Sequence, residues 1–548
     1  MNKMAIVGLL SILMISTLQG KEKWVADKQY DICIYGETVA GISAAIQAAR
    51  MGKSVVLISK NNHVGGTTTS GLTATDINRN QLVGGIAREF YQRIYTWYSN
   101  PASWRNQDRE AFFIASHHRT FTGKNDSLKK QWVYESHIAE QILKDMLHEN
   151  KVEVLYNERL DLSDDVAKQD NRIQKIRMES GLEIGAKVFV DATYEGDLMA
   201  KSGVSYVVGR EGNEKYNETL NGIRPGDIIG NGEQSVDPYR IEGDPSSGLL
   251  PFLDSGLWGK PGDPDNRTQT YCYRLTLTND PANRIELTKP AHFNPLWHEL
   301  LIRELQLNPD RPLQKIVSLT PMPNKKTDSN FLNMFGNSYD YPEGDYATRA
   351  RIEQEHKDYA LGMLWVLKTD PRVPEPVRQE LAEWGLAKDE FQDTDHFPYQ
   401  IYVREARRMI GSFVMTEHHV AKDRTADAPK PIGIGSYAMD SHYVSRFVDK
   451  EGRLRLEGGM YESTSPYGIS YDAMTPKATE CTNLVVPVCL SASHVAYTSI
   501  RMEPTYMVLG QAAGAAAALS LDSGTSLQSV PYEELRQILV DSGQIMPE

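Results

Sequence analysis

The first residues with the types and spacing to bind a cofactor form a glycine turn near the start of the chain. Residues 36–41, Gly-Glu-Thr-Val-Ala-Gly, have the layout of a dinucleotide-binding turn, with Thr38 in place of the second glycine. Gly36 permits a tight turn, and Gly41 lets the following helix approach the strand before it. The free N–H groups at the start of such a helix bind pyrophosphate. The turn therefore predicts nucleotide binding, with the Thr38 hydroxyl as an extra donor.

The residues after the next predicted strand decide which nucleotide to expect. A carboxylate that accepts from the adenosine ribose is usual there, but this chain has Ser59 followed by Lys60. This pair fits the 2′-phosphate of NADP, and it equally fits a weakened ribose contact to FAD. The loop from His63 to Gly71 is long and rich in glycine and hydroxyl groups, which suits a flavin and its pyrophosphate. We expect FAD, with NADP as the minor alternative.

Two histidines are candidates for proton transfer. Hydride transfer from an alcohol to a flavin needs a base for the hydroxyl proton, and histidine titrates near neutral pH. His494 lies between a predicted strand and a predicted helix, where a substrate could reach it. His442 is a candidate substrate contact or alternative base. For His494, a structural role with its ring bonded to the backbone is the open alternative.

Arginines are candidates for binding an anion. Arg501 could hold a substrate carboxylate or contact the flavin, unless it forms a buried ion pair with Glu503 or Glu405. Arg404, Arg407 and Arg408 have the spacing to share one helix face. In an acidic chain such a cluster favours an anionic cofactor or substrate. A solvated face of ion pairs is the open alternative, and Arg404 is the catalytic candidate among the three.

Alternating strands and helices would position these residues. Short apolar, β-branched runs predict strands, and longer runs with apolar residues on one face predict helices. Predicted strands cover 30–35, 54–58, 152–155, 187–190 and 483–488, and predicted helices cover 40–51, 85–99, 136–148 and 506–520, with a further helical portion within 345–388. The first strand, helix and second strand form a βαβ unit, which implies adjacent parallel strands.

The expected fold class is α/β, with a split Rossmann-like FAD-binding domain and a large inserted α+β substrate-capping domain. The parallel sheet flanked by helices takes its first part from residues 28–205 and its second part from 475–548. Residues 206–474 form the predicted cap. This middle segment is dense in aromatic residues, proline and aspartate, and it contains no second nucleotide fingerprint.

Composition and the first residues indicate which partners and compartment to expect. The 548 residues carry 72 acids and 59 bases, a formal charge of −13, so nucleic acid is not an expected partner. A mean hydropathy of −0.45 argues against a polytopic membrane protein. Residues 1–20 place Lys3 before an uncharged run from Met4 to Leu18, the layout of a signal peptide. We expect a periplasmic or secreted protein without stable membrane insertion.

Several separated runs resemble one family, the FAD-dependent oxidoreductases of the glutathione-reductase-like superfamily. Within it, the sequence is most similar to the secreted bacterial branch often labelled xanthan-lyase-like. The matching runs are 35–41, 63–66, 83–91, 190–197, 402–408 and 481–518. The resemblance implies the split FAD domain with its cap, a chain return beside the cofactor at Ala192-Thr193, and a helix around 509–514 whose N-terminus faces the flavin. Ser59 departs from the glutamate usual in the family.

The motifs and the resemblance together give a set of expected FAD contacts. These residues are Gly36, Thr38, Val39, Ala40, Gly41, Ser59, Lys60, Gly65, Gly66, Thr67, Thr68, Ser70, Gly71, Ala192, Thr193, Gly196, Asp197, Gly510, Gln511 and Ala512. No metal site is expected, because His298-Glu299 lacks a second histidine four residues on and His418-His419 stands alone.

The expected function is an exported FAD-dependent oxidoreductase that transfers a hydride between flavin and a small polar organic substrate. A carbohydrate or glycoside is suggested by tyrosines of the predicted cap, namely Tyr339, Tyr341, Tyr399, Tyr437, Tyr467 and Tyr471. The electron acceptor is expected to be a quinone, a periplasmic carrier or oxygen. Two alternatives stay open, a redox-assisted glycoside lyase or hydrolase with no net electron acceptor, and a non-catalytic carbohydrate-binding flavoprotein.

Overall fold

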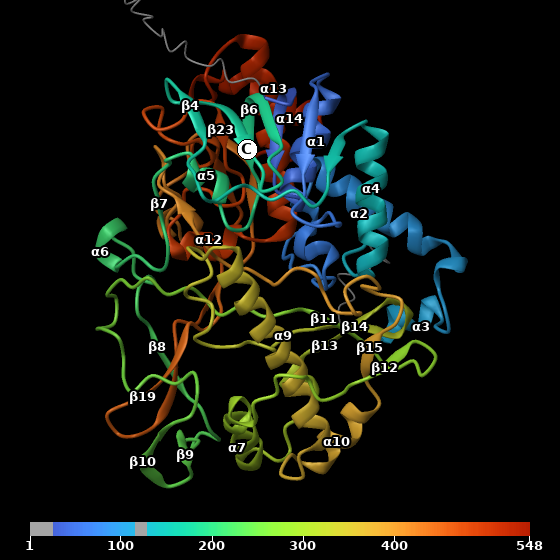
Figure 1. Cartoon of the computed structure of the whole chain (residues 1–548), viewed down its shortest axis with the longest axis vertical. Helices are drawn as coiled ribbons and strands as arrows, with labels where there is room; N and C mark the ends of the chain where they lie inside the picture. Colours follow the sequence, from blue (N-terminus) through green and yellow to red (C-terminus); the bar gives the residue numbers. More distant parts are fainter. Residues whose placement is uncertain (1–25, 116–128, 548) are drawn as a thin grey trace, which may run out of the picture.

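The computed structural model describes residues 26–115 and 129–547 of the chain (Figure 1). The predicted signal peptide at 1–20 lies outside the described residues. Among the residues that are described, no helix combines the length and the apolar character needed to cross a membrane.

Strands from both ends of the chain form one seven-stranded sheet. Its order is β3 (Glu153–Leu155), β2 (Val55–Ile58), β1 (Lys28–Tyr35), β6 (Glu183–Asp191), β5 (Arg172–Arg177) and β4 (Ala167–Gln169), with β23 (Leu484–Val485) paired to β6. The pairs β1–β2, β2–β3, β1–β6 and β6–β23 are parallel, whereas β5 and β4 are antiparallel. β2 is buried at all four positions, as expected of a parallel strand covered on both faces.

Helices from opposite ends of the chain cover this sheet. They are α1 (Val39–Arg50), α2 (Gly85–Ser99), α4 (Ser136–Glu149), α13 (Glu503–Ser523) and α14 (Tyr532–Asp541). Figure 1 shows α1 in blue beside the red C-terminal helices. A Cβ on Gly510 would lie 2.1 Å from the Ala40 carbonyl oxygen, and one on Gly514 would lie 2.2 Å from that of Ala44. The two helices therefore touch through their backbones, which only glycine permits at these positions.

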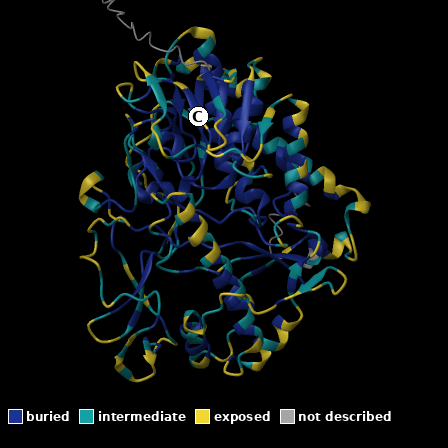
Figure 2. Ribbon diagram, viewed as in Figure 1, coloured by how far each residue is buried: buried dark blue, intermediate teal, exposed yellow. Residues whose placement is uncertain are grey.

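The middle of the chain builds a second layer below the parallel sheet in Figure 1. A five-stranded sheet has the order β12 (Arg284–Glu286), β15 (Gly385–Ala387), β11 (Leu275–Thr278), β14 (Lys326–Ser329) and β13 (Leu319–Met322). A three-stranded sheet joins β19 (Ser445–Val448), β20 (Leu454–Glu457) and β8 (Pro225–Ile228). The long helix α9 (Tyr346–Thr369) and α10 (Glu375–Ala382) complete this part, and Figure 2 shows that one side of α9 is buried.

Short elements connect these layers. The strands are β7 (Tyr206–Val207), β9 (Tyr239–Ile241), β10 (Asp244–Leu249), β16 (Arg408–Met409), β17 (Pro431–Gly435), β18 (Met439–Ser441), β21 (Met460–Glu462) and β22 (Tyr467–Ser470). The helices are α3 (Arg109–Ala115), α5 (Asp197–Lys201), α6 (Asn213–Tyr216), α7 (Glu299–Leu307), α8 (Gln314–Val317), α11 (Glu417–Val420) and α12 (His494–Ile500).

The predicted elements of the parallel layer are present, with differences at their ends. The expected strand at 483–488 is shorter, because β23 ends at Val485, two residues before Pro487. The C-terminal helix begins three residues earlier than expected, at Glu503. The four cysteines are buried and form no disulfide. The domain boundaries at 205 and 474 stay a prediction, although the shared sheet joins segments on both sides of the middle part.

A histidine buried in the second layer makes stability depend on pH. His298 stacks on Phe293 at a centroid distance of 5.7 Å, and neither ring nitrogen has a hydrogen-bond partner among the described residues. Burial lowers the pKa of His298 from 6.5 to about 3. Below pH 6.5 this histidine is therefore protonated in the unfolded chain and stays unprotonated in the folded chain. The fold loses stability as the pH falls from 6.5 towards 3.

We expect His298→Leu to remove this pH dependence, because leucine fills a similar volume without titrating. The unfolding free energy of the wild type relative to the variant should fall by about 2 kcal/mol between pH 7.5 and pH 5. Urea denaturation at the two pH values measures the change. His356, whose burial lowers its pKa to about 4, is present in both proteins and cancels from the comparison. A difference that does not vary with pH would contradict the prediction.

Candidate functional site

The glycine turn forms the tight corner between β1 and α1 that the sequence predicts. Gly36 has φ +114°, and a Cβ there would lie 2.5 Å from the carbonyl carbon of Ala192. Thr38 caps α1 by accepting from the N–H of Gly41 at 3.4 Å, and its hydroxyl donates to the Ala192 carbonyl at 2.6 Å. That hydroxyl is therefore used within the protein. The buried N–H of Ala40 has no hydrogen-bond partner in the part of the chain that the structure describes.

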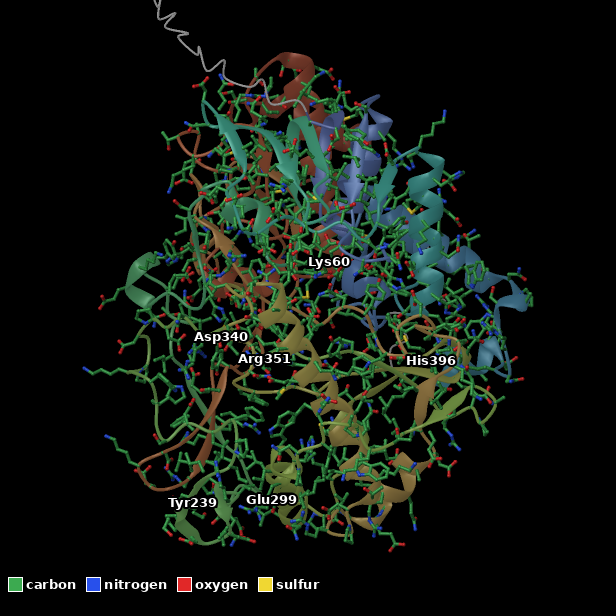
Figure 3. All side chains as sticks on the ribbon, viewed as in Figure 1. Lys60, Tyr239, Glu299, Asp340, Arg351 and His396 are labelled. Carbon is green, nitrogen blue, oxygen red and sulfur yellow. The ribbon has the colours of Figure 1, made fainter. Side chains whose placement is uncertain are left out.

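A cavity of about 210 Å³ opens beside this turn, and we call it the strand-end pocket. Its lining includes Glu37 after β1, Lys60 after β2, Thr193 after β6, and Glu353 of α9. Figure 3 places Lys60 between the parallel layer and the upper end of α9. Ligands of open α/β sheets bind outside the carboxyl ends of the strands, which is where this pocket lies.

Of the pair after β2, only Lys60 lines the pocket. The Ser59 hydroxyl lies 2.9 Å from the Asn61 carbonyl oxygen and 2.7 Å from that of His63, so it bonds within its own loop. Lys60 pairs with Glu195 at 3.2 Å. Burial alone would lower the pKa of Lys60, but the carboxylates of Glu195 and Glu37 raise it above its usual value.

The glycine and hydroxyl loop reaches the start of α13. The hydroxyls of Thr67 and Thr68 donate to the two carboxylate oxygens of Glu503 at 2.7 and 2.8 Å, and the Tyr194 hydroxyl donates to it at 2.9 Å. Burial raises the pKa of Glu503. The structure thus brings the loop, the segment after β6 and the N-terminus of α13 to one place. Sequence reasoning gave Glu503 only as a partner for Arg501.

The remaining loop residues are held by the segment after β6 and by the second layer. A Cβ on Gly66 would lie 2.4 Å from the Tyr194 hydroxyl, and one on Gly71 would lie 1.8 Å from the Arg274 carbonyl oxygen. Gly65 has φ +109°, and the Ser70 hydroxyl accepts from the N–H of Gln400 at 2.9 Å. Close backbone approach explains the glycines at these positions.

After β6, hydrogen bonds and ion pairs fix the segment that was expected beside the cofactor. Thr193 donates from its N–H and its hydroxyl to Asp191, at 3.0 and 2.6 Å. The N–H of Gly196 donates to the Thr193 hydroxyl at 2.9 Å. Asp197 pairs with Arg349 at 2.6 Å and with Arg407 at 2.7 Å, so its carboxylate is already matched by two cations.

Gly510, Gln511 and Ala512 lie two turns inside α13 rather than at its start. Gly510 touches α1, and Gln511 accepts from the N–H of Ile86 at 2.9 Å and donates to Gln47 at 3.1 Å. Ala512 is fully buried. The helix begins at Glu503, and Gly510 and Gln511 contact other helices, so the contact of these three residues with the cofactor stays a prediction.

The expected helix face of arginines at 404–408 is wrong. The segment is extended, because Tyr402 bridges to Cys272 and β16 pairs with β7. Arg407 pairs with Asp197 at 2.7 Å, and Arg408 pairs with Glu211 and Glu405, each at 2.8 Å. Strand pairing with distant parts of the chain prevents a helix here, and the three arginine side chains contact different groups.

The His494 side chain is enclosed within the protein. It is 2 % exposed, its Nδ1 lies 2.8 Å from Glu405, and its Nε2 lies 3.5 Å from the Ser441 hydroxyl. Its backbone N–H donates to Glu211 at 3.0 Å. These contacts favour the structural alternative for His494, with its ring oriented by a carboxylate rather than by the backbone.

Arg404 and Arg501 converge on Tyr402. Arg501 donates to the Tyr402 hydroxyl and to the Asp440 carbonyl, each at 2.8 Å, and its guanidinium lies 5.9 Å from the Tyr402 ring centroid. Arg404 lies 4.6 Å from that centroid and donates to the Thr270 carbonyl. Neither forms an ion pair within the described part of the chain, so the alternative for Arg501, a buried ion pair with Glu503 or Glu405, is absent there.

His442 is the histidine that faces these cations. It is half-buried, and its pKa lies well below the usual value because of burial and because of the positive charges of Arg404, Arg501 and Arg274. Arg274 itself is neutralised by Asp328, with two contacts of 2.7 Å. His442 is therefore a neutral imidazole at physiological pH.

A narrow cleft adjoins this cluster at the start of α13. It is lined by Asp76, Tyr437, Met502 and Pro504 among others. Burial raises the pKa of Asp76, the Arg274 charge opposes that shift, and the Asp440 carboxylate adds to it. Sequence reasoning missed Asp76, and its position just after the glycine and hydroxyl loop was the only available signal.

One cluster has the composition of a metal site, formed by Glu135, His137 and Glu390. The ammonium of Lys326 lies 2.7 Å from Glu135 and 2.8 Å from both Glu390 and Asp389. A lysine therefore supplies the positive charge among these carboxylates.

Comparison with known families identifies the kind of protein. A family model described as FAD dependent oxidoreductase matches residues 31–539, which is nearly the whole chain. The chain belongs to this family of FAD-dependent oxidoreductases. It is accordingly an enzyme with FAD as its cofactor. A comparison with the curated proteins gave no match.

Solved structures of a hydroxylase and a deaminase align with parts of the chain. Anhydrotetracycline hydroxylase OxyS from Streptomyces rimosus is 10% identical, with a TM-score of 0.22 over 37% of this chain and 38% of that one. L-amino acid deaminase from Proteus vulgaris is 14% identical, with a TM-score of 0.24 over 38% of this chain and 55% of that one. This oxidoreductase thus spans less than two thirds of the length of both structures.

The residues of this FAD-dependent oxidoreductase fit the cofactor at the glycine turn. The corner at Gly36 has no room for a side chain, the Ala40 N–H is a buried donor without a partner among the described residues, and the strand-end pocket lies beside both. Such a helix start binds the pyrophosphate. Val39 and Gly41 belong to the same first turn of α1. When bound, FAD supplies the hydride-accepting and hydride-donating chemistry.

Proposed function

We propose that this enzyme transfers a hydride between FAD and a small polar organic substrate. The observation that carries the proposal is the meeting of three segments at one place, namely the loop 65–71, the start of α13, and the residues 437–442 of the middle part. The segment that we propose to bind the flavin is thereby adjacent to polar and charged residues from the middle of the chain. Hydride transfer needs this adjacency.

The arrangement of the chain supports a split FAD-binding domain with a capping insertion. β23 and α13 add to the layer of β1 and α1, and residues 206–474 contribute the surface around Arg404 and His442. We propose in addition that the protein is exported and belongs to the xanthan-lyase-like branch, on the pattern of residues 1–20 and the family motifs. A quinone, a periplasmic carrier or oxygen would then accept the electrons.

His442 is our proposed proton acceptor for an alcohol substrate. It is a half-buried, neutral imidazole, whereas the ring of His494 is enclosed by Glu405 and Ser441. His494 then acts through its neighbours as a positioning residue. We expect His442→Asn to lower kcat by about 100-fold with little change in KM, since general bases contribute about 10²–10⁴-fold.

The role of His442 is checked by steady-state kinetics on whichever substrate reduces the flavin, with His494→Asn made in parallel. If the substitution at His494 lowers kcat as much as the one at His442 while both proteins keep their flavin, the assignment of the base to His442 is incorrect.

The carbohydrate part of the proposal rests on few residues. Tyr467 and Tyr471 are buried in the core, whereas Tyr341 and Tyr399 line the strand-end pocket. Tyr437 is the residue of that group which lines the cleft at α13. A sugar stacked on tyrosine is therefore supported mainly by Tyr437, and the proposed substrate class is small and polar rather than specifically saccharide.

Anaerobic bleaching of the bound flavin tests the proposal. The purified enzyme is mixed with panels of alcohols, sugars and hydroxy acids, and the visible flavin absorbance is followed before and after oxygen is admitted. Loss of absorbance with one class, and its return with an acceptor, is the expected result. Product release without any acceptor would favour the lyase or hydrolase alternative. Ligand binding with no absorbance loss in either direction of electron flow would favour a binding protein.

A further inference from the structure

We infer that the substrate carries a carboxylate group, and that Arg404 and Arg501 bind it. The inference rests on the proposed function, because it names the substrate class of the same site. It starts from the state of these two guanidinium groups.

Both arginines are buried charges without an anionic partner among the residues described. Arg404 is 1 % exposed and Arg501 is 3 % exposed, and the Nε of each has no hydrogen-bond partner in that part of the chain. Their bonded Nη atoms donate to neutral groups, including a carbonyl oxygen for each side chain and the Tyr402 hydroxyl. A buried, unpaired charge is costly unless an opposite charge joins it.

Most other buried arginines among the described residues do have that opposite charge, and Arg446 is an exception. Arg210 pairs with Glu457 at 2.6 Å, Arg274 with Asp328 at 2.7 Å, Arg349 with Asp197 at 2.6 Å, and Arg408 with Glu211 at 2.8 Å. The fold therefore neutralises most of the buried guanidinium groups that the structure describes. Arg404 and Arg501 depart from that pattern, and Arg501 directly precedes Met502, which lines the narrow cleft.

The position of the pair suits one shared anion. Both guanidinium groups lie against the ring of Tyr402, at 4.6 and 5.9 Å from its centroid, and both lower the pKa of His442. Contact with an aromatic face stabilises each cation only in part. A planar carboxylate can accept hydrogen bonds from two guanidinium groups.

Nearby acids favour a single negative charge over a double one. Asp76 and Asp440 act on Arg501, and Asp328 already neutralises Arg274. A phosphate dianion would be repelled by these carboxylates more strongly than a carboxylate monoanion. One carboxylate monoanion would neutralise one of the two unpaired positive charges. The cofactor pyrophosphate is expected at the separate turn of Gly36, so it does not fill this role.

The chemistry extends to the proton acceptor. Burial is the main cause of the low pKa of His442, and the charges of Arg404 and Arg501 add to it. A carboxylate bound by the arginines would offset the charge part of that shift and so raise the affinity of the imidazole for a proton. Only a substrate that brings its own negative charge would strengthen the base in this way. Selection of carboxylates would thus act on the rate as well as on binding.

Binding of small acids to the flavin-loaded enzyme tests the inference. The probes are acetate, glycolate and D-gluconate, each matched with a neutral counterpart, acetamide, ethylene glycol and D-glucose. Binding is followed by perturbation of the flavin absorbance and by the shift in Tm. We expect the acids to bind at least about 10-fold more tightly than their counterparts. Equal binding of acids and neutral molecules, or no binding of any acid below about 50 mM, overturns the inference.

Variants locate the interaction. Arg501→Gln and Arg404→Gln should each weaken binding of the acids by about 10- to 100-fold. Arg446→Gln is the matched control, because Arg446 is also buried without an ion pair in the described residues, but lies over Phe335 at 4.3 Å. Flavin content confirms folding of each variant. Unchanged binding in Arg501→Gln and Arg404→Gln, with flavin retained, contradicts the assignment.

The binding assay and the bleaching assay fail independently. Tight binding of acids with no flavin reduction by any compound supports the carboxylate site and counts against hydride transfer. Flavin reduction by neutral alcohols, with no preference for acids, supports hydride transfer and overturns the carboxylate site.

Discussion

Gly36→Ala should give a protein that carries almost no flavin. An alanine Cβ at this position lies 2.5 Å from the carbonyl carbon of Ala192 and 2.6 Å from the N of Thr193, so the corner must open. The positive φ of +114° adds strain for any residue with a side chain. Opening the corner moves the start of α1 away from the strand-end pocket. We expect FAD affinity to fall by about 100-fold or more.

The ratio of flavin to protein absorbance after purification and dialysis measures this loss. Gly52→Ala is the matched control, because Gly52 also has a positive φ, +78°, but a Cβ there would meet nothing within 4 Å among the described residues. The control should lose about 1 kcal/mol of stability through strain and keep its flavin. Full flavin content in Gly36→Ala would show that the cofactor does not depend on this corner.

Lys326→Met should destabilise the fold more than any surface substitution. Methionine removes the ammonium that lies within 2.8 Å of Glu135, Glu390 and Asp389. Burial alone would raise the pKa of Glu390, but the positive charges of Lys326 and His137 lower it to about 2. Without the lysine, buried carboxylates repel each other, and the expected cost is about 3–5 kcal/mol at pH 7.

Urea denaturation measures that cost, and its pH dependence identifies the cause. The deficit of Lys326→Met should shrink as the pH falls towards 5, because protonation relieves the unpaired carboxylates in the variant. Arg351→Met breaks an exposed pair with Glu355 at 3.0 Å and should cost less than about 1 kcal/mol. Equal costs for the two substitutions would mean that burial of the cluster contributes nothing.

The local sequence pattern was sufficient to predict those features of the candidate site that depend on backbone geometry. Gly36 and Gly41 identify a turn because the residue types follow from steric limits at one corner. The strands around that turn are apolar over their buried lengths, so their positions follow from periodicity. The loop with Thr67 and Thr68 was also recognisable, since glycine and hydroxyl groups are unusual in such density.

Partner choice between distant side chains was not predictable. Arg404, Arg407 and Arg408 have helical spacing, yet the chain is extended there because it pairs with a strand far away in sequence, β7, with Arg408 opposite Val207. His442 and His494 differ in the groups that surround their imidazole rings. Those groups come from several separate segments of the chain, so the difference could not be predicted from the sequence. Asp76 carries no motif at all.

The crossing of α1 and α13 has a consequence for how the protein is made. The Ala40 carbonyl meets Gly510 at a spacing that admits no side chain, and β23 pairs with β6. The first cofactor-binding turn therefore lacks its supporting helix until the ribosome has added more than four hundred further residues. At about 5–20 residues per second this delay lasts roughly 20–100 s. Until then the nascent chain exposes an apolar α1, so a holding chaperone, or transport before folding, would suit its synthesis.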